Sequence, residues 1–329
     1  MGQRQGLACR NWLPYSDLVD NRQCIRVGLP ARQVPEVSVK AGTDITAQAG
    51  ASAGAAVQTA KAGAGGRFDG MTAVVTGGSH GLGRAITHAF AAEGGRVVIC
   101  DLVESGYFAG NPAVATVTGD IGSPGLADTV IAAAVSRWGQ VDILVNDAAS
   151  YPDGTLLEMP GEAWDRVFRV NVTGTFLMTQ AFARHCVSRR AENAAVVSIS
   201  SGSARNPRPG GAAYSASKAA VETMSKVFAM ELGPHGIRVN VVSPGYIDVR
   251  QWSEAFPDRA PEELRAALVR SIPLGQAGHP ADIAQAVLFL ASRAAGHITG
   301  AVLEVDGGSN AGRFSLETFI TNGDGHERG

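Results

Sequence analysis

The sequence has few cysteines and no excess of charge of either sign. Its 329 residues include four cysteines, far apart and without a CxxC pair, and 28 basic against 30 acidic side chains. Scattered cysteines favour reduced thiols in a cytoplasmic protein over a disulfide framework or a zinc site. A formal net charge of −2 provides no basic surface for nucleic acid or an anionic membrane. We therefore expect neither as a partner.

Long hydrophobic runs are also missing. No stretch reaches the roughly 20 apolar residues that span a bilayer, and no basic segment followed by an apolar core marks a secretory signal. Both absences agree with a cytoplasmic localisation. The composition that remains, 45% hydrophobic and 18% charged residues, is that of a soluble globular protein with one large domain or two small ones.

Large apolar side chains are nearly absent from residues 41–66, which are rich in alanine and glycine, and residues 1–40 are mixed and weakly patterned. Such a segment cannot bury enough surface to offset the entropy that it loses on ordering. We predict a mobile N-terminal extension over 1–66, in which a linker or an upstream start is favoured over a transit segment. A single domain is expected over 67–309, followed by a C-terminal tail over 310–329.

Short β-branched runs alternate with longer helical patterns from residue 68 onward. The predicted strands cover 72–76, 96–100, 113–117, 141–145, 195–199, 237–242 and 301–305. Strands that are apolar throughout are covered on both faces, which indicates a parallel sheet between two layers of helices. We predict an α/β fold, a Rossmann-like doubly wound sheet of seven parallel strands, with its ligand at the carboxyl ends of the strands.

A cluster of glycines, TGGSHGLG at 76–83, stands between the first predicted strand and a helix. This is the place where a helix N-terminus offers free N–H groups to phosphate, and Gly77, Gly81 and Gly83 would let the backbone approach it closely. A mononucleotide P-loop is excluded, because Arg84 and Ala85 stand where it needs Lys and Ser or Thr. The dinucleotide pattern G-x-G-x-x-G lacks its third glycine, so an ordinary strand-to-helix turn stays the alternative.

Asp101 ends the second predicted strand, downstream of Gly83. A carboxylate at this place can accept hydrogen bonds from both hydroxyls of an adenosine ribose, which predicts NAD as the cofactor. A 2′-phosphate would meet like charge there, so NADP is expected to be disfavoured unless His80 or Arg84 compensates. The alternative is a strand-end carboxylate that merely starts a turn.

Tyr214 and Lys218 lie four residues apart in YSASK, so they share one face of a helix. An ordinary pair on a helix surface is the alternative interpretation. Ser200 and Ser201, however, end a predicted strand shortly before, and a phenol, an ammonium and a hydroxyl can meet at the carboxyl edge of the sheet. These groups suit hydride transfer between a carbinol and a nicotinamide, with a tyrosinate taking the proton.

Electrostatics sets the condition for this chemistry. Free tyrosine titrates near pH 10, so ionisation at neutral pH requires about 4 kcal/mol. One positive charge about 4 Å away supplies that much at an effective dielectric of 20. We expect Lys218 to supply this charge, helped by an oxidised nicotinamide ring, and also to bind the nicotinamide ribose. Ser201 is expected to hold the substrate oxygen.

Together the motifs resemble the short-chain dehydrogenase/reductase family, over residues 68 to 309. The matching segments are TGGSHGLG, RVNVTG, SISS, YSASK, VSPGYI and the C-terminal PADIAQAVLFLAS and ITGAVLEVDGG. The resemblance implies four catalytic residues, Asn171, Ser201, Tyr214 and Lys218, and prefers Ser201 to Ser200. It also implies that Asn171 kinks a helix and supports a proton relay to the lysine.

The resemblance further implies a set of cofactor-binding residues along the same edge. They are Gly77, Ser79, His80, Gly81, Leu82, Gly83, Asp101, Asp120, Ile121, Asn146, Ala148, Tyr214, Lys218, Pro244, Gly245 and Ile247.

Two positions depart from the family. The segment NDAA (146–149) replaces N-N-A-G and puts a Cβ at Ala149 near the cofactor. Val249 replaces a threonine that binds the carboxamide, which leaves this contact to the main chain of Ile247.

Arg205, Arg208 and Arg250 lie in loops that would face the substrate. They indicate either a carboxylated or phosphorylated substrate or, more commonly, solvated loop arginines. The histidines show no metal-ligand spacing, so no metal is expected. The resulting hypothesis is an NAD(H)-dependent oxidoreductase acting on a small-molecule secondary alcohol or ketone. A catalytically silent NAD-binding sensor of the same fold is the alternative.

Two predicted helices, at 172–186 and 217–232, carry more apolar positions than one buried stripe needs. Packing against the core accounts for part of this surplus. In the family that the chain resembles, these helices form a subunit interface. The resemblance therefore implies a homodimer or homotetramer.

Overall fold

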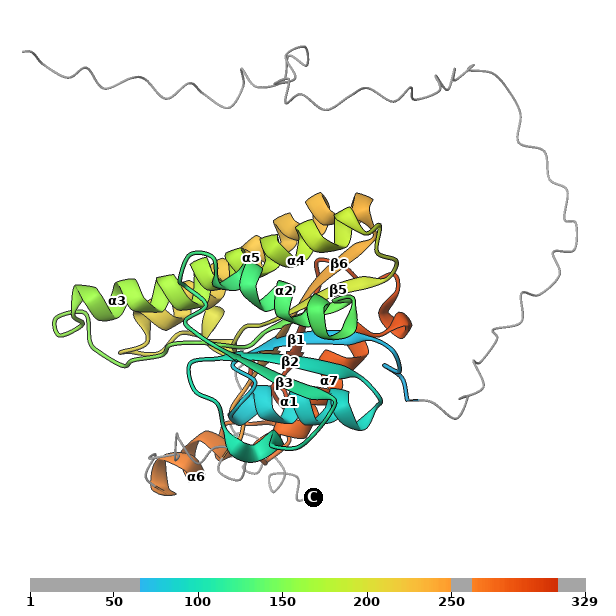
Figure 1. The fold of residues 1–329 in the computed structure, drawn as a ribbon. Helices are drawn as coiled ribbons and strands as arrows, with labels where there is room; N and C mark the ends of the chain where they lie inside the picture. The colour runs from blue at the N-terminus through green and yellow to red at the C-terminus, as the bar shows by residue number, and fades with distance from the viewer. Residues whose placement is uncertain (1–65, 250–261, 313–329) are drawn as a thin grey trace, which may run out of the picture. The chain divides into compact units, whose positions relative to one another are not determined.

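Seven strands alternate with helices along the chain of the computed structural model, which describes residues 66–249 and 262–312 (Figure 1). The strands are β1 (Thr72–Thr76), β2 (Arg96–Asp101), β3 (Val114–Thr118), β4 (Ile143–Asn146), β5 (Ala194–Ile199), β6 (Ile237–Pro244) and β7 (Val302–Val305). The helices are α1 (Gly81–Ala92), α2 (Leu126–Trp138), α3 (Gly161–Phe168), α4 (Thr175–Ser188), α5 (Ala212–Leu232), α6 (Glu262–Arg270) and α7 (Pro280–Ala291). A π-helical segment, η3 (Arg169–Gly174), joins α3 to α4.

The sheet is parallel throughout, with the strand order β3-β2-β1-β4-β5-β6-β7. This order confirms the predicted doubly wound sheet of seven parallel strands. The order reverses between β1 and β4, where Thr76 pairs with Asn146 at the carboxyl ends. The chain leaves both strands at this point, which opens a crevice for a ligand between the two following segments.

Two hydrophobic cores cover the two faces of the sheet. Val74 and Val75 are neighbours in β1, and both are fully buried because successive side chains of a strand point to opposite faces. Val75 packs with Phe90 of α1 and Leu288 of α7, whereas Val74 packs with Phe182 of α4. Figure 1 shows α1 and α7 on one face and α2, α4 and α5 on the other. Helices therefore cover both faces of the sheet.

Some expectations concern residues that the structure does not describe. Of the predicted extension over 1–66, only Gly66 is described, and of the predicted tail only residues 310–312. Arg250 also lies outside the described residues. Within residues 66–249 and 262–312, none of the helices combines the length and the apolar character that crossing a bilayer requires.

Arg238, in β6, is a charged side chain built into the packing between the sheet and α7. It is only 9% exposed. Its guanidinium donates to the carbonyls of Leu290 (2.5 Å), Ala291 (3.0 Å) and Ser292 (3.1 Å) at the end of α7. The last carbonyls of a helix have no partner within the helix, so Arg238 caps α7 and ties it to the sheet.

We predict that Arg238→Met destabilises the protein by about 3 kcal/mol, because it leaves these helix-end carbonyls buried without a donor. Arg238→Lys keeps the charge and one donor group, so a smaller loss is expected. The measurement is urea unfolding at a fixed protein concentration. Equal stability of Arg238→Met and the unchanged protein would show that the cap contributes nothing.

Candidate active site

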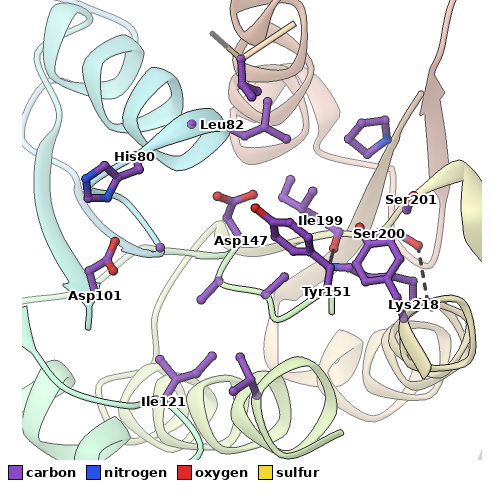
Figure 2. Close-up of a pocket in the computed structure, with 18 of the residues that line it drawn as sticks. His80, Leu82, Asp101, Ile121, Asp147, Tyr151, Ile199, Ser200, Ser201 and Lys218 are labelled. Atoms are coloured by element: carbon purple, nitrogen blue, oxygen red, sulfur yellow. Dashed lines mark hydrogen bonds between the residues drawn. The ribbon is translucent and has the colours of Figure 1, made fainter. Parts of the chain in front are cut away.

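A cavity of about 560 Å³ lies at the carboxyl edge of the sheet. Each of five strands sends a residue into its wall: Gly77 after β1, Asp101 at the end of β2, Asp147 after β4, Ser200 after β5 and Gly245 after β6. Its size is that of a site for a small organic ligand or cofactor. Figure 2 shows the side chains that line it.

The glycine turn after β1 forms one side of the cavity. Gly77 and Gly81 adopt left-handed backbone angles, with φ of +69° and +53°, which side chains other than glycine rarely accept. A Cβ at Gly83 would lie 2.2 Å from the carbonyl oxygen of Gly77, so the turn closes only with glycine there. α1 begins at Gly81, and its first N–H groups have no partner within the helix. The turn therefore fits an anionic group such as a diphosphate.

Asp101 lies at one end of the cavity and supports the glycine turn. Its carboxylate accepts from the backbone N–H of Ser79 (3.0 Å) and of Leu102 (2.7 Å). Two carboxylate oxygens offer about four acceptor positions, so capacity remains for the hydroxyls of a ligand. His80 lies beside Asp101 in the cavity wall (Figure 2). Arg84 is 2% exposed and its Nε donates to the Ser79 carbonyl (2.9 Å), so it supports the turn from behind.

Asp120 and Ile121 line the same end of the cavity. Burial raises the pKa of Asp120, but hydrogen bonds from Arg169 and from the Gly122 N–H outweigh it and hold this pKa below its usual value. Asp120 is therefore ionised at neutral pH. Its ion pair with Arg169 ties the loop after β3 to η3, the segment between α3 and α4.

Lys218, on α5, lies at the other end of the cavity and is only 3% exposed. Its Nζ donates to the carbonyl of Ile199 (2.7 Å) and lies 5.6 Å from the ring centre of Tyr214. Burial lowers the pKa of Lys218 to about 8, although Asp147 acts in the opposite direction. The amine thus stays mainly protonated at neutral pH.

Tyr214 shares the cavity wall with Lys218. Burial raises the pKa of Tyr214 to about 12, the Ser201 hydroxyl lowers it by hydrogen bonding, and Asp147 and Tyr151 raise it further. The expectation that Lys218 makes this phenol acidic is therefore not met by the protein's own groups, because the loss of solvation dominates. Tyr214 is a neutral phenol at neutral pH, poised to donate a proton.

The two candidate serines differ in their partners, although both line the cavity. The Ser200 hydroxyl donates to Glu222 of α5 (2.8 Å), whereas Ser201 hydrogen-bonds the Tyr214 phenol and accepts from the Ser203 N–H (3.2 Å). Of the two serines, Ser201 is therefore the one that is hydrogen-bonded to the tyrosine. Sequence reasoning missed Glu222, since only the folded position of α5 brings it to Ser200.

Asn171 lies behind the cavity and not in its wall. It belongs to the π-helical turn η3 and is 1% exposed. Its amide donates to the Ser150 carbonyl (3.0 Å) and the Ser217 hydroxyl (2.9 Å), and its oxygen accepts from the Ser150 N–H (2.7 Å). Ser217 in turn donates to the Tyr214 carbonyl (2.7 Å). Asn171 therefore joins the loop after β4 to the helix that carries the tyrosine.

The predicted site residues, taken together, divide into those that line the cavity and those that do not. The cavity wall includes Gly77, His80, Gly81, Leu82, Asp101, Asp120, Ile121, Ala148, Ser201, Tyr214, Lys218, Pro244, Gly245 and Ile247. Ser79, Gly83 and Asn146 are not part of it. The Asn146 amide donates to Thr179 (3.2 Å) and Ser198 (3.3 Å) in the core, and its contact with a cofactor stays a prediction.

Asp147, the residue after Asn146, lies in the cavity wall. It accepts a hydrogen bond from the Gly83 N–H at the start of α1. Burial raises the pKa of Asp147 to about 7; Lys218 and Gly83 lower it, and Asp101 raises it. Sequence reasoning noted the NDAA segment but did not assign a role to its aspartate.

A smaller cavity of about 220 Å³ shares Tyr151 and Tyr214 with the larger one and includes Asp153, Ser203 and Arg208. Arg208 forms an exposed ion pair with Asp153 (2.7 Å) across it. Tyr151 and Tyr214 meet edge to face, with ring centres 6.1 Å apart.

Arg205, another of the predicted loop arginines, has carboxylate partners within the protein. It is paired with Glu222 (3.3 Å) and Glu304 (2.9 Å). These ion pairs account for Arg205, as that of Arg208 does, without an anionic substrate.

The chain is similar to known proteins over most of its length. A family described as enoyl-(acyl carrier protein) reductase matches residues 77–310. The 3-oxoacyl-(acyl-carrier-protein) reductase FabG of Thermotoga maritima is 34% identical over 255 residues, which cover 74% of this chain and 98% of that protein. L-rhamnose 1-dehydrogenase (NAD(P)(+)) of a Sphingomonas species is 36% identical over 250 residues, or 73% of this chain and 96% of that one.

A solved structure is similar as well. It is described as a short-chain dehydrogenase/reductase, glucose/ribitol dehydrogenase, from Brucella melitensis. The TM-score is 0.66 at 30% identity, and the match covers 74% of this chain and 98% of that one.

Proposed function

The chain belongs to the short-chain dehydrogenase/reductase family of oxidoreductases, and from this premise we propose that it interconverts a secondary alcohol and a ketone with NAD(H). One observation carries the proposal. A single cavity joins an anion-binding helix end and Asp101 to a phenol, a hydroxyl and a buried ammonium, from Tyr214, Ser201 and Lys218. This set supplies both a cradle for a dinucleotide and the groups for proton transfer.

The residues along the cavity fit a nicotinamide dinucleotide. The first N–H groups of α1 would hold the diphosphate, and Asp101 would accept from the adenosine ribose. Lys218 would bind the nicotinamide ribose, and Pro244, Gly245 and Ile247 would flank the ring. Val249 also lines this end of the cavity, where it adds an apolar contact but no hydroxyl.

When bound, the nicotinamide supplies a hydride to a carbonyl carbon or accepts one from a carbinol. In the direction of reduction, Tyr214 donates its phenolic proton to the carbonyl oxygen, and a tyrosinate remains. The Ser201 hydroxyl holds the same oxygen by a hydrogen bond, and the Lys218 cation stabilises the tyrosinate. The reverse steps oxidise the alcohol, with the tyrosinate taking up the proton.

We propose NAD rather than NADP because Asp101 is a carboxylate whose remaining acceptor positions suit ribose hydroxyls. A phosphate on the ribose would meet this like charge. Arg84, one of the two residues that could have compensated, is buried and donates to the Ser79 carbonyl.

The proposed substrate is a small molecule that reaches Tyr214 through the smaller cavity. Tyr151, Ser203 and the ion pair of Asp153 with Arg208 surround this entrance with hydrogen-bonding groups. The relatives act, by their names, on a 3-oxoacyl-(acyl-carrier-protein) and on L-rhamnose. These names support a carbonyl or carbinol as the reacting group.

We also propose a homodimer or homotetramer. The outer faces of α4 and α5 leave large apolar side chains in contact with solvent: Phe176 is 39%, Val227 40% and Met230 71% exposed. Exposed apolar groups on adjacent helices are typical of a subunit interface.

A reducing, cytoplasmic compartment is the proposed location. Cys100 and Cys186 are buried free thiols, and burial raises the pKa of each to about 12. Thiols with such a raised pKa are poor nucleophiles. Both therefore serve as small core residues rather than as redox groups.

We predict that Tyr214→Phe lowers kcat by about 10³-fold while the dissociation constant for NADH stays within about threefold, because only proton transfer is removed. The assay follows NADH absorbance with a panel of ketones and secondary alcohols, and NADH binding is followed by fluorescence. Tyr151→Phe is the matched control, since it removes a neighbouring phenol of the cavity wall. Full turnover by Tyr214→Phe, or loss with Tyr151→Phe alone, would contradict the assignment.

The choice of cofactor gives a second prediction. Asp101→Asn removes the like charge, so the ratio of kcat/KM for NAD to that for NADP should fall by about tenfold. Asp128→Asn, on the exposed surface of α2, changes the net charge equally and should leave the ratio unchanged. A preference of the unchanged protein for NADP would overturn the role of Asp101.

A further inference from the structure

Asp147 places a carboxyl group where the cavity is built to receive an anion. It follows β4 directly, at the point where the strand order reverses, and faces the start of α1 across the crevice. Resting on the proposed function, we propose that Asp147 binds the cofactor as a neutral carboxylic acid. One of its oxygens accepts from the Gly83 N–H, and the protonated oxygen donates to the diphosphate or the adjoining ribose.

The position of the carboxyl group argues against its charged form in the complex. Its Oδ2 lies 2.8 Å from the place of a Cβ on Gly83, and it takes the hydrogen bond of the Gly83 N–H. A carboxylate there would occupy the positive end of the α1 dipole and repel a diphosphate. A carboxylic acid keeps the bond to Gly83 and adds a donor toward the ligand.

The groups around Asp147 come from several elements. Figure 2 shows it between Asp101 and His80 on one side and Tyr151 and Lys218 on the other. Desolvation in the cavity wall favours the neutral acid, as does Asp101 at the end of β2. Lys218 of α5 and the Gly83 N–H favour the carboxylate. These opposing influences hold the pKa of Asp147 at about 7, so both forms are accessible near neutral pH.

Protonation of Asp147 also benefits the reacting end of the site. An ionised Asp147 raises the pKa of Tyr214 and neutralises part of the Lys218 charge. The neutral acid leaves this charge available to stabilise the tyrosinate that proton donation creates. Cofactor binding and catalysis therefore favour the same form of Asp147.

Proton uptake on cofactor binding follows from this proposal. The negative diphosphate raises the pKa of Asp147 above its value of about 7 in the free protein, so the complex holds more protons than its separate parts. The affinity for the cofactor is then highest below pH 7. It falls as the pH rises above 7, by up to about tenfold per pH unit.

The test measures NADH binding to the full-length protein by fluorescence titration at pH 6, 7 and 8. The dissociation constant of the unchanged protein should rise by about tenfold between pH 6 and pH 8. Asp147→Asn keeps the acceptor and a donor but does not titrate, so its dissociation constant should change by less than about threefold over this range. Asp128→Asn, the matched control with the same change of net charge, should behave like the unchanged protein.

Calorimetry provides a readout that needs no variant. NADH binding at pH 7 in buffers of different ionisation enthalpy should show uptake of about half a proton by the unchanged protein. Asp147→Asn should take up clearly less, because Lys218, with a pKa of about 8, is mainly protonated at this pH. Absence of proton uptake by the unchanged protein overturns the proposal. An equal pH dependence of the dissociation constant in both proteins also overturns it, and assigns that dependence to Lys218 or another group. If the unchanged protein binds neither NADH nor NADPH at any pH, the proposed function itself fails.

Discussion

The charge of Lys218, held inside the protein, is the constraint on which the site depends. A buried ammonium is costly unless hydrogen bonds and opposite charge compensate it. Here the Ile199 carbonyl at the end of β5 accepts a hydrogen bond from the ammonium, and Asp147 after β4 supplies negative charge when it is ionised. The compensation stays incomplete, because the pKa of Lys218 still falls to about 8. The remaining positive charge faces the cavity, where a tyrosinate or a cofactor can use it.

Sheet topology brings these partners together. Parallel strands end at one edge, so the residues after β1, β2, β4, β5 and β6 line one cavity although they are distant in sequence. The reversal of strand order between β1 and β4 sets the start of α1 opposite Asp147. The π-helical turn at Asn171 fixes the loop after β4 to α5, and with it the position of Tyr214. The fold therefore orients a proton donor at one end of the cavity and a site for an anion at the other.

Much of this could be predicted from local sequence. Short apolar runs between helical patterns located all seven strands to within about two residues, because a buried strand leaves a short-range pattern in the sequence. The spacing of Tyr214 and Lys218 was likewise readable, since residues four apart share a helix face. The role of Asp147 was not, because its protonation depends on α1, β2 and α5 packing around it. The raised pKa of Tyr214 in the protein without cofactor was not readable either, for the same reason: desolvation by the whole fold outweighs the charges near the phenol.

The central claim is that this cavity holds a nicotinamide dinucleotide with its ring next to the proton donor Tyr214, and that the pair reduces a carbonyl group. The most direct measurement follows deuterium from NADH labelled at the reactive carbon of the ring into the products of a carbonyl panel, by mass spectrometry. The account predicts deuterium on the carbinol carbon of at least one product, with NADH oxidised in equal amount. Binding of NADH without label transfer to any carbonyl compound would contradict it and identify a cofactor sensor instead.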